Sequence, residues 1–289
     1  MNRKTKGIVF ILLAALFFAL MNMFVKATGD LPFFQKSFFR NVVSLIVSFI
    51  IFSRSNVNYK MNKDDFIILL KRATIGTIGI LCNFYAVDHL ILADANMLNK
   101  LSPFFAIIFS YLLLKEKPSK IQVVSLVIAF FGALLIIKPG FGFNSFAALI
   151  GLIGGMSAGL AYTYVRILGI HNMPNALIVL GFSIISTLVS LPMTILKWTP
   201  MSLKQLIFLL LAGLMATIAQ FSLSIAYRNA PAKELSVFDY SQIVYSAIIG
   251  FIVFNQIPDL LSLVGYFLII GVAILMFLIE NDYIKLRSD

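Results

Sequence analysis

Long apolar stretches make up almost the whole sequence, and short polar or turn-forming segments separate them. Each stretch is close to the ~20 residues that a helix needs to cross a bilayer. The breaks between them carry charges, glycine or proline, as in Gly29–Pro32 and Gln256–Asp259. Ten spans are predicted, at residues 7–27, 33–53, 65–88, 92–114, 120–138, 146–167, 174–196, 203–227, 232–255 and 260–280. We therefore expect an all-α membrane protein with ten transmembrane helices.

The composition excludes several classes of function. Only 12% of the 289 residues are charged, against about 25% in a soluble domain, so the lipid bilayer is an expected partner and nucleic acid is not. The net charge of +11 is better explained by loop lysines that set topology. Cys82 is the only cysteine, which excludes an intrachain disulfide and a cysteine-based metal site. Zinc and phosphate-loop motifs are absent, so we expect no cofactor, no metal and no ATP-driven pumping.

The second half of the sequence echoes the first half at a constant offset of 140 residues. Equivalent positions include the pairs Lys26 and Arg166, Asn99 and Asp239, Glu116 and Gln256, and Pro118 and Pro258. Residues 1–139 and residues 140–289 each hold five predicted spans, and because five is odd the second half must enter the membrane upside down. We predict two inverted-topology five-helix repeats, an arrangement typical of transporters whose site lies near the membrane midplane.

Loop charges orient the bundle. Lys and Arg favour the cytoplasmic side of a membrane. If the N-terminus is cytoplasmic, 16 of the 23 Lys and Arg residues lie on that side or within a turn or two of it. The loops around residues 54–63 and 115–120 are basic, whereas their equivalents in the second half hold only Lys197 and Lys204. We therefore predict a multi-pass protein of the cytoplasmic (inner) cell membrane with both termini in the cytoplasm.

Two of the predicted spans carry charged residues near their centres. Ala93–Pro118 contains Lys100, and the equivalent stretch Lys233–Pro258 contains Asp239. At 1.5 Å per residue they lie about 12 Å and about 10 Å from opposite membrane faces. A charge at such a depth costs on the order of 3 kcal/mol, so it needs a partner or a wet cavity. Either the two residues form an ion pair that only ties the halves together, or they bind a charged solute.

Further candidates lie in spans other than five and ten, which predicts that spans five and ten are peripheral. The uncharged candidates are Asn22, Asn83, Tyr85, Asn96, Asn99, Tyr162, Tyr164, Gln220, Tyr227, Tyr240 and Gln242. Each tyrosine could equally be an aromatic residue of the membrane interface. Arg40, about seven residues into span two, could clamp a carboxylate or reach for the interface from a helix end.

Other polar residues are assigned to the membrane surfaces. Asp88, His89 and Asp94 cluster at the outer end of spans three and four. They could gate the pathway or relay protons, but we expect solvated loop residues. Lys71 and Arg72 are expected to reach the inner lipid headgroups by extending their long side chains. These residues are therefore not expected to take part in a central site.

The segment Gly155–Gly159 matches the G-x-S-x-G motif of serine hydrolases. A nucleophile elbow needs a strand, a sharp turn and a helix, whereas Ser157 lies in the middle of a membrane span. Gly151, Gly155 and Gly159 also recur every four residues, which forms a face on which another helix can pack closely. We expect packing and no catalytic residue, and an intramembrane hydrolase using Ser157 is the weaker alternative.

The sequence resembles the EamA-type ten-helix members of the drug/metabolite transporter superfamily over about residues 6–280. The resemblance is carried by Phe18–Lys26, Leu69–Gly79, Tyr85–Leu90, Ala93–Pro118 with its LLLKEKPS, Ile121–Pro139 and Phe254–Leu275. It implies a secondary transporter with a central cavity lined by spans other than five and ten. It also implies that Glu116 is the family's acidic residue at the end of span four, and Gln256 departs from that pattern in the second half.

The function that we expect is transport of a small polar or charged metabolite by alternating access. The polar-centred stretches look most like family members that move amino acids, carboxylates or nucleoside-type metabolites such as S-adenosylmethionine. A multidrug exporter of lipophilic compounds is the alternative, because 13% aromatic residues and eleven Met suit an adaptable apolar cavity. A monomer and a homodimer are equally compatible with the sequence.

Overall fold

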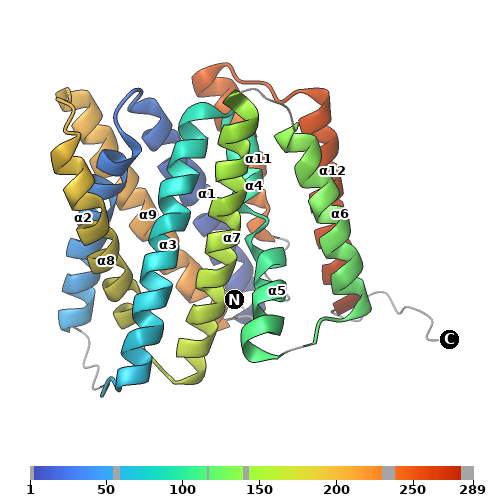
Figure 1. Cartoon of the computed structure of the whole chain (residues 1–289), viewed down its shortest axis with the longest axis horizontal. Helices are drawn as coiled ribbons and strands as arrows, with labels where there is room; N and C mark the ends of the chain where they lie inside the picture. Colours follow the sequence, from blue (N-terminus) through green and yellow to red (C-terminus); the bar gives the residue numbers. More distant parts are fainter. Residues whose placement is uncertain (1–2, 55–58, 116, 139–142, 230–237, 281–289) are drawn as a thin grey trace.

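Apolar helices account for nearly all of the chain that the computed structural model describes, which is residues 3–54, 59–115, 117–138, 143–229 and 238–280 (Figure 1). In chain order the helices are α1 (Arg3–Ala27), α2 (Phe33–Arg54), α3 (Lys63–His89), α4 (Leu92–Asn99), α5 (Ser102–Leu114), α6 (Lys120–Ile137), α7 (Phe143–Ile170), α8 (Asn175–Leu196), α9 (Leu203–Asn229), α11 (Ser241–Phe254) and α12 (Leu260–Glu280). The predicted all-α class is confirmed.

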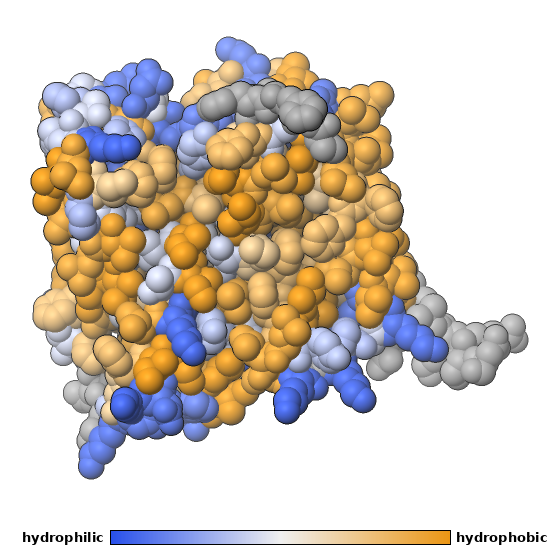
Figure 2. Space-filling view, in the orientation of Figure 1, coloured by the Kyte–Doolittle hydropathy of each residue, from blue (hydrophilic) through white to orange (hydrophobic). Residues whose placement is uncertain are grey.

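Most of these helices are long and apolar enough to cross a membrane. Within the described residues eight segments meet that description, with α4 and α5 counted as one segment, and α11 is a shorter apolar helix. The 27-residue α3 is long enough but carries more polar side chains. Figure 2 shows the result on the face in view as a broad apolar band, with most hydrophilic side chains gathered near its upper and lower edges.

The expected continuous helix at residues 92–114 is broken, because α4 ends at Asn99 and α5 begins at Ser102. Pro103 has no N–H group, so it cannot donate the hydrogen bond that would carry the helix across the break. Lys100 therefore adopts a non-helical ψ of 3°. Tyr240, which is 140 residues further on, also forms a turn before α11. Discontinuous helices of this kind build the binding sites of many transporters.

The packed helix pairs repeat at the 140-residue offset, so that replacing each helix of a pair by its equivalent gives another packed pair. α1 lies along α9 as α3 lies along α7, and α5 packs on α7 as α11 packs on α1. α2 pairs with its own equivalent α8, and α6 pairs with its equivalent α12. In Figure 1, α1 runs upward, whereas its equivalent α7 begins at the upper edge. This is the pseudo-two-fold symmetry of inverted repeats, so the predicted fold class is confirmed.

The glycine face of α7 packs against the break between α4 and α5. A Cβ atom added at Gly155 would stand 2.4 Å from the Leu98 carbonyl oxygen, and one at Gly159 would stand 2.6 Å from the Ser102 carbonyl oxygen. Only glycine lets the two backbones approach so closely. Gly155 and Gly159 therefore hold the broken helix in the bundle interior, and their predicted role in packing is confirmed.

α6 and α12 form the peripheral pair that the sequence predicts for spans five and ten, at one edge of the bundle (Figure 1). The two helices approach most closely at Gly132 and Gly265. A Cβ atom at Gly265 would lie 2.7 Å from the Gly132 carbonyl oxygen and 2.8 Å from Ile136 Cγ1. By contrast, a Cβ atom at Gly271 on the same helix would meet nothing within 4 Å.

We predict that Gly265→Ala lowers the melting temperature of the detergent-solubilised protein, because overpacking costs about 1–3 kcal/mol. Gly271→Ala is the matched control on the same helix. It should leave the melting temperature unchanged or raise it, since alanine favours helices over glycine by about 0.5–1 kcal/mol. Equal melting temperatures for the two variants would contradict the close approach of α6 and α12.

Candidate functional site

Lys100 and Asp239 form an ion pair between the two halves of the chain. Lys100 Nζ donates to Asp239 Oδ2 at 2.6 Å, and the two side chains are 9% and 17% exposed. Lys100 follows the C-terminus of α4 and Asp239 stands just before α11. Each charge therefore lies at the helix end whose dipole stabilises it. The second carboxylate oxygen, Asp239 Oδ1, is buried and has no hydrogen-bond partner among the described residues.

Tyr162 lies on α7, three residues after Gly159, which packs against the Ser102 carbonyl oxygen at the break. Tyr162 is 47% exposed.

A cluster of side-chain amides lies one helical turn from Lys100. Asn96 Oδ1 accepts hydrogen bonds from Asn22 Nδ2 at 2.6 Å and from Gln242 Nε2 at 2.7 Å. Asn96 Nδ2 donates to the Leu92 carbonyl oxygen at 2.8 Å. Thus α1, α4 and α11 meet through three residues that the sequence singles out. Asn83 Nδ2 adds a longer contact of 3.4 Å to Asn22 Oδ1.

The remaining predicted candidates lie elsewhere. Tyr85 stacks on His89 near the outer end of α3, with the two ring centroids 4.1 Å apart, and Tyr240 is buried in an apolar cluster. Asn99 and Tyr164 are half-buried, and their side chains make no hydrogen bond within the described part of the chain. Tyr227 and Glu116 lie outside the residues whose side chains are described. For all the candidates, a role in binding stays a prediction.

Two expectations about the outer surface are wrong. Asp88 is not a solvated loop residue, because it accepts from the fully buried Lys36 at 2.5 Å. Asp94 is also buried and accepts from the hydroxyl of Tyr266 on α12. Lys26 Nζ donates to the carbonyl oxygens at the C-terminal end of α3, which are otherwise unsatisfied. Buried polar contacts therefore close this end of the bundle.

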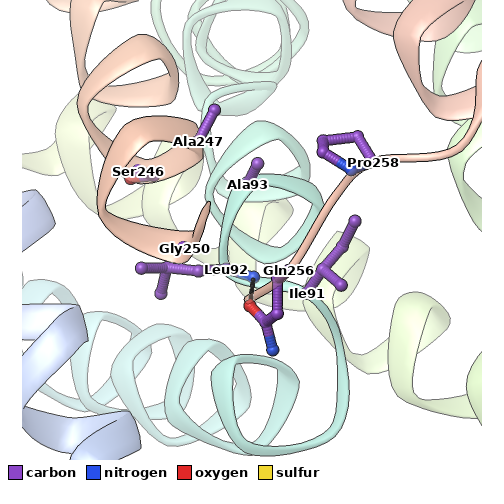
Figure 3. Close-up of a pocket in the computed structure, with 8 residues that line it drawn as sticks. All are labelled: Ile91, Leu92, Ala93, Ser246, Ala247, Gly250, Gln256 and Pro258. Atoms are coloured by element: carbon purple, nitrogen blue, oxygen red, sulfur yellow. Dashed lines mark hydrogen bonds between the residues drawn. The ribbon is translucent and has the colours of Figure 1, made fainter. Parts of the chain in front are cut away.

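Gln256 has a structural role that the sequence pattern did not reveal. Its Oε1 accepts from the backbone N–H of Leu92 at 3.0 Å, so it caps the N-terminus of α4 from the other half of the chain. Figure 3 shows this contact beside a small pocket that Gly250 and Pro258 also line. A neutral amide suffices here, because the cap needs only an acceptor.

A second cross-half contact lies at the outer end of the peripheral pair. Lys138 Nζ donates to Asp259 Oδ2 and also contacts Ser262 Oγ at 3.1 Å. The hydrogen bond from Lys138 lowers the pKa of the Asp259 carboxyl below its ordinary value. The carboxylate therefore stays ionised, and the pair persists, throughout the neutral pH range.

Arg40 and Arg72 lie together in the interior, away from the Lys100–Asp239 pair. Arg40 lines a pocket between α2, α8 and α9 with Gln220, another predicted candidate. Arg72 does not reach the lipid headgroups as expected. Its guanidinium instead stacks on the ring of Phe182, with 4.1 Å between the guanidinium carbon and the ring centroid. The long side chain turns inward because Phe182 and the glycine at Gly76 leave space for it.

Comparison with known proteins identifies the family. The model of the EamA-like transporter family matches the chain twice, over residues 5–138 and 145–278. The chain belongs to this family. A pseudopaline exporter, CntI, from Pseudomonas aeruginosa is 31% identical over 275 residues, which cover 93% of this chain and 94% of that protein.

Other relatives are also transporters. The riboflavin transporter of Vibrio cholerae is 26% identical and shares 89% of this chain and 88% of its own length. Human solute carrier family 35 member G1 is 25% identical over 87% of this chain and 73% of its own length. A solved crystal structure with 16% identity superimposes with a TM-score of 0.67 over 94% of this chain and 98% of the other, which shows the fold alone. The protein is therefore a multi-pass membrane protein of small-molecule transport.

We predict that Asn96→Leu destabilises the protein, because it leaves the buried amides of Asn22 and Gln242 without their acceptor. Each orphaned donor costs about 1–3 kcal/mol, so the melting temperature in detergent should fall by several degrees. Asn99→Leu is the matched control, since the Asn99 side chain makes no hydrogen bond within the described residues. If Asn96→Leu melted at the same temperature as Asn99→Leu, the amide cluster would contribute nothing to the stability of the protein.

Proposed function

We propose that this protein is a secondary transporter that moves a small polar or charged metabolite across the cytoplasmic membrane by alternating access. The observation that carries the proposal is the ion pair of Lys100 with Asp239 between the two broken helices. One partner comes from each repeat. Opposite charges placed where the two halves meet suit a solute that carries charge itself.

The energetics favour a working pair over a purely structural one. A buried ion pair rarely stabilises a protein more than apolar residues of the same size would, because desolvation offsets the attraction. A solute with an ammonium group and a carboxylate could take over both interactions, its ammonium facing Asp239 and its carboxylate facing Lys100. The unpartnered Asp239 Oδ1 leaves an acceptor free for such an exchange.

The substrate classes that fit this chemistry are amino acids, carboxylates and nucleoside-type metabolites such as S-adenosylmethionine. Relatives named for pseudopaline export and for riboflavin transport indicate that the family accommodates different solutes on one fold. Charged groups at the centre favour a polar solute over lipophilic drugs. Ser157 lies where α7 packs on Gly79 of α3, which supports a packing role and not hydrolysis.

In the mechanism that we propose, the halves formed by residues 1–139 and 140–289 rock around the central site. Polar contacts join the halves at the outer side, among them those of Gln35 with Thr199, Thr28 with Gln205, Lys138 with Asp259, and Asp94 with Tyr266. Outward opening must break these contacts, whereas the glycine faces of α7 let the halves slide with their backbones in contact. Each outer contact is a hydrogen bond or ion pair that water can replace.

We predict that Lys100→Met and Asp239→Asn each abolish transport in proteoliposomes while the protein stays folded. Accumulation of unmodified radiolabelled solute, from a panel of amino acids, carboxylates and nucleosides, is the measurement. Loss of either charge removes an interaction worth about 1.5–3 kcal/mol, so uptake should fall at least about tenfold.

The double variant Lys100→Met/Asp239→Leu separates function from structure. If the pair only ties the halves together, replacing both charges by apolar residues restores transport, which would defeat the proposal. If the pair binds solute, the double variant is stable but inactive. Formation of a chemically altered product in detergent would instead favour the hydrolase alternative.

The proposed topology has its own test in intact cells. In a Cys82→Ser background, a membrane-impermeant maleimide should label Lys197→Cys and should not label Lys60→Cys until the membrane is permeabilised. Both positions are exposed and lie at opposite ends of the bundle, and the basic loops mark the cytoplasmic end. Labelling of Lys60→Cys without permeabilisation would reverse the proposed orientation.

A further inference from the structure

Two arginines lie inside the bundle with no acidic partner among the described residues. Arg40 on α2 is 2% exposed and Arg72 on α3 is 8% exposed. Both lie near Phe182, because Arg72 stacks on its ring and Arg40 lines the same pocket as that ring. Neither forms a salt bridge within the described part of the chain. A buried charge with no counter-charge is one of the most costly arrangements in a protein, so this pair requires an explanation.

Several hydrogen-bond donors here have no acceptor. Arg40 Nε, Arg72 Nε and Arg72 Nη1 are buried and make no hydrogen bond, and neither does the hydroxyl of Ser183. Arg40 and Ser183 line the same pocket, together with Ser44, Thr217 and Gln220. The pocket is thus rich in donors and holds no carboxylate among its lining residues.

Both guanidinium groups are held in fixed positions. Arg40 Nη1 donates to Asn41 Oδ1 at 2.6 Å, and Asn41 in turn donates to Ser37 and Ser186. Arg72 lies over the ring of Phe182, which also lines the pocket. These contacts fix the orientation of the arginines and leave their other N–H groups available. Such preorganisation lowers the entropic cost of binding a ligand.

The arginines are not part of the repeated packing scheme. At the 140-residue offset, Arg40 corresponds to Leu180 and Arg72 corresponds to Ala212, which are both buried apolar residues. The same positions in the second repeat therefore pack well without a charge. The structural needs of the fold do not account for the two arginines.

We propose that Arg40 and Arg72 bind a second oxyanion of the transported solute, a carboxylate or phosphate group distinct from the carboxylate that faces Lys100. This inference rests on the proposed transport function and narrows the substrate to an anionic or zwitterionic molecule. Guanidinium groups bind such oxyanions through paired, charge-assisted hydrogen bonds.

The test measures the melting temperature of the full-length protein in detergent with phosphate, succinate or citrate, against chloride at equal ionic strength. At least one of these anions should raise it saturably, because ligands that bind the folded state stabilise it. Arg40→Gln and Arg72→Gln should each weaken the apparent affinity at least about tenfold. Lys71→Gln removes the neighbouring exposed charge and should keep the wild-type response.

The melting temperature in chloride alone, without phosphate, succinate or citrate, gives an independent readout. Arg40→Gln keeps an amide donor for Asn41 but removes an unpaired buried charge, so it should melt at or above the wild-type temperature in chloride. Arg72→Gln should behave in the same way. A lower melting temperature for both variants, together with an unchanged anion response, would assign the arginines a structural role and overturn the proposal.

A lipid headgroup could supply the same chemistry. The melting measurement is therefore repeated in vesicles of phosphatidylcholine with and without phosphatidylglycerol. The inference requires stabilisation by soluble anions in pure phosphatidylcholine. If only phosphatidylglycerol stabilises the protein, the pocket holds a lipid and the assignment to a solute is wrong.

Transport assays separate this inference from the wider proposal. Lys100→Met should lose transport but keep the anion response, since Lys100 is not in the arginine pocket. If the wild type responds to anions but transports none of the panel, the transport proposal fails and the anion site stands. If Arg40→Gln transports an anionic solute with unchanged KM, the anion site fails and the transport proposal stands.

Discussion

The backbone hydrogen bond governs this structure, because lipid offers no partner for an unpaired N–H or C=O group. A continuous helix satisfies this requirement along most of each span. The helix is interrupted at Lys100 and Leu101, just before Pro103. Both backbone N–H groups still donate, Lys100 to the Asn96 carbonyl oxygen and Leu101 to the Leu98 carbonyl oxygen, so the break meets the requirement with local turns. α7 covers the break with Gly155 and Gly159, which let the backbone enter the interior of the bundle. The candidate site is located at this break.

The two halves share one scheme of helix packing, but their central polar residues differ. The helix pairs repeat under the 140-residue offset, so one packing solution serves both halves. The polar centres do not repeat: Lys100 corresponds to Tyr240 and Asp239 corresponds to Asn99. A symmetric pair of like charges would repel across the midplane. Opposite charges on non-equivalent positions avoid this repulsion. They also give the site two ends of different charge, which a solute with two different ends can recognise.

The buried charges fall into two groups with different environments. At the C-terminal end of α3, Lys36 is paired with Asp88, and Lys26 caps α3 through backbone carbonyl oxygens. These cations are satisfied by the protein, so they close the bundle. Nearer the centre, Asp239 has one free oxygen, and Arg40 has a free N–H group. Groups that the protein leaves unsatisfied are the ones that a polar solute can complete.

Periodicity and repeat spacing were enough to predict the membrane class, the ten spans and the inverted repeats, because these depend only on residue type along the chain. The meeting of Lys100 with Asp239 was one of two open alternatives. The inward turn of Arg72, the burial of Asp94 and the capping of α4 by Gln256 were beyond sequence reasoning. Each depends on which side chain of another helix stands opposite.

The sequence by itself determined that this chain folds as two antiparallel five-helix halves in a membrane. The apolar stretches define the spans, and an odd number of spans in each half inverts the second half. Only the tertiary structure decided which polar groups are paired and which are left free. The physical reason is that burial and hydrogen bonding are properties of contacts between distant residues. Arg40 and Lys36 are both buried cations on α2, yet only Lys36 has an acidic partner among the described residues.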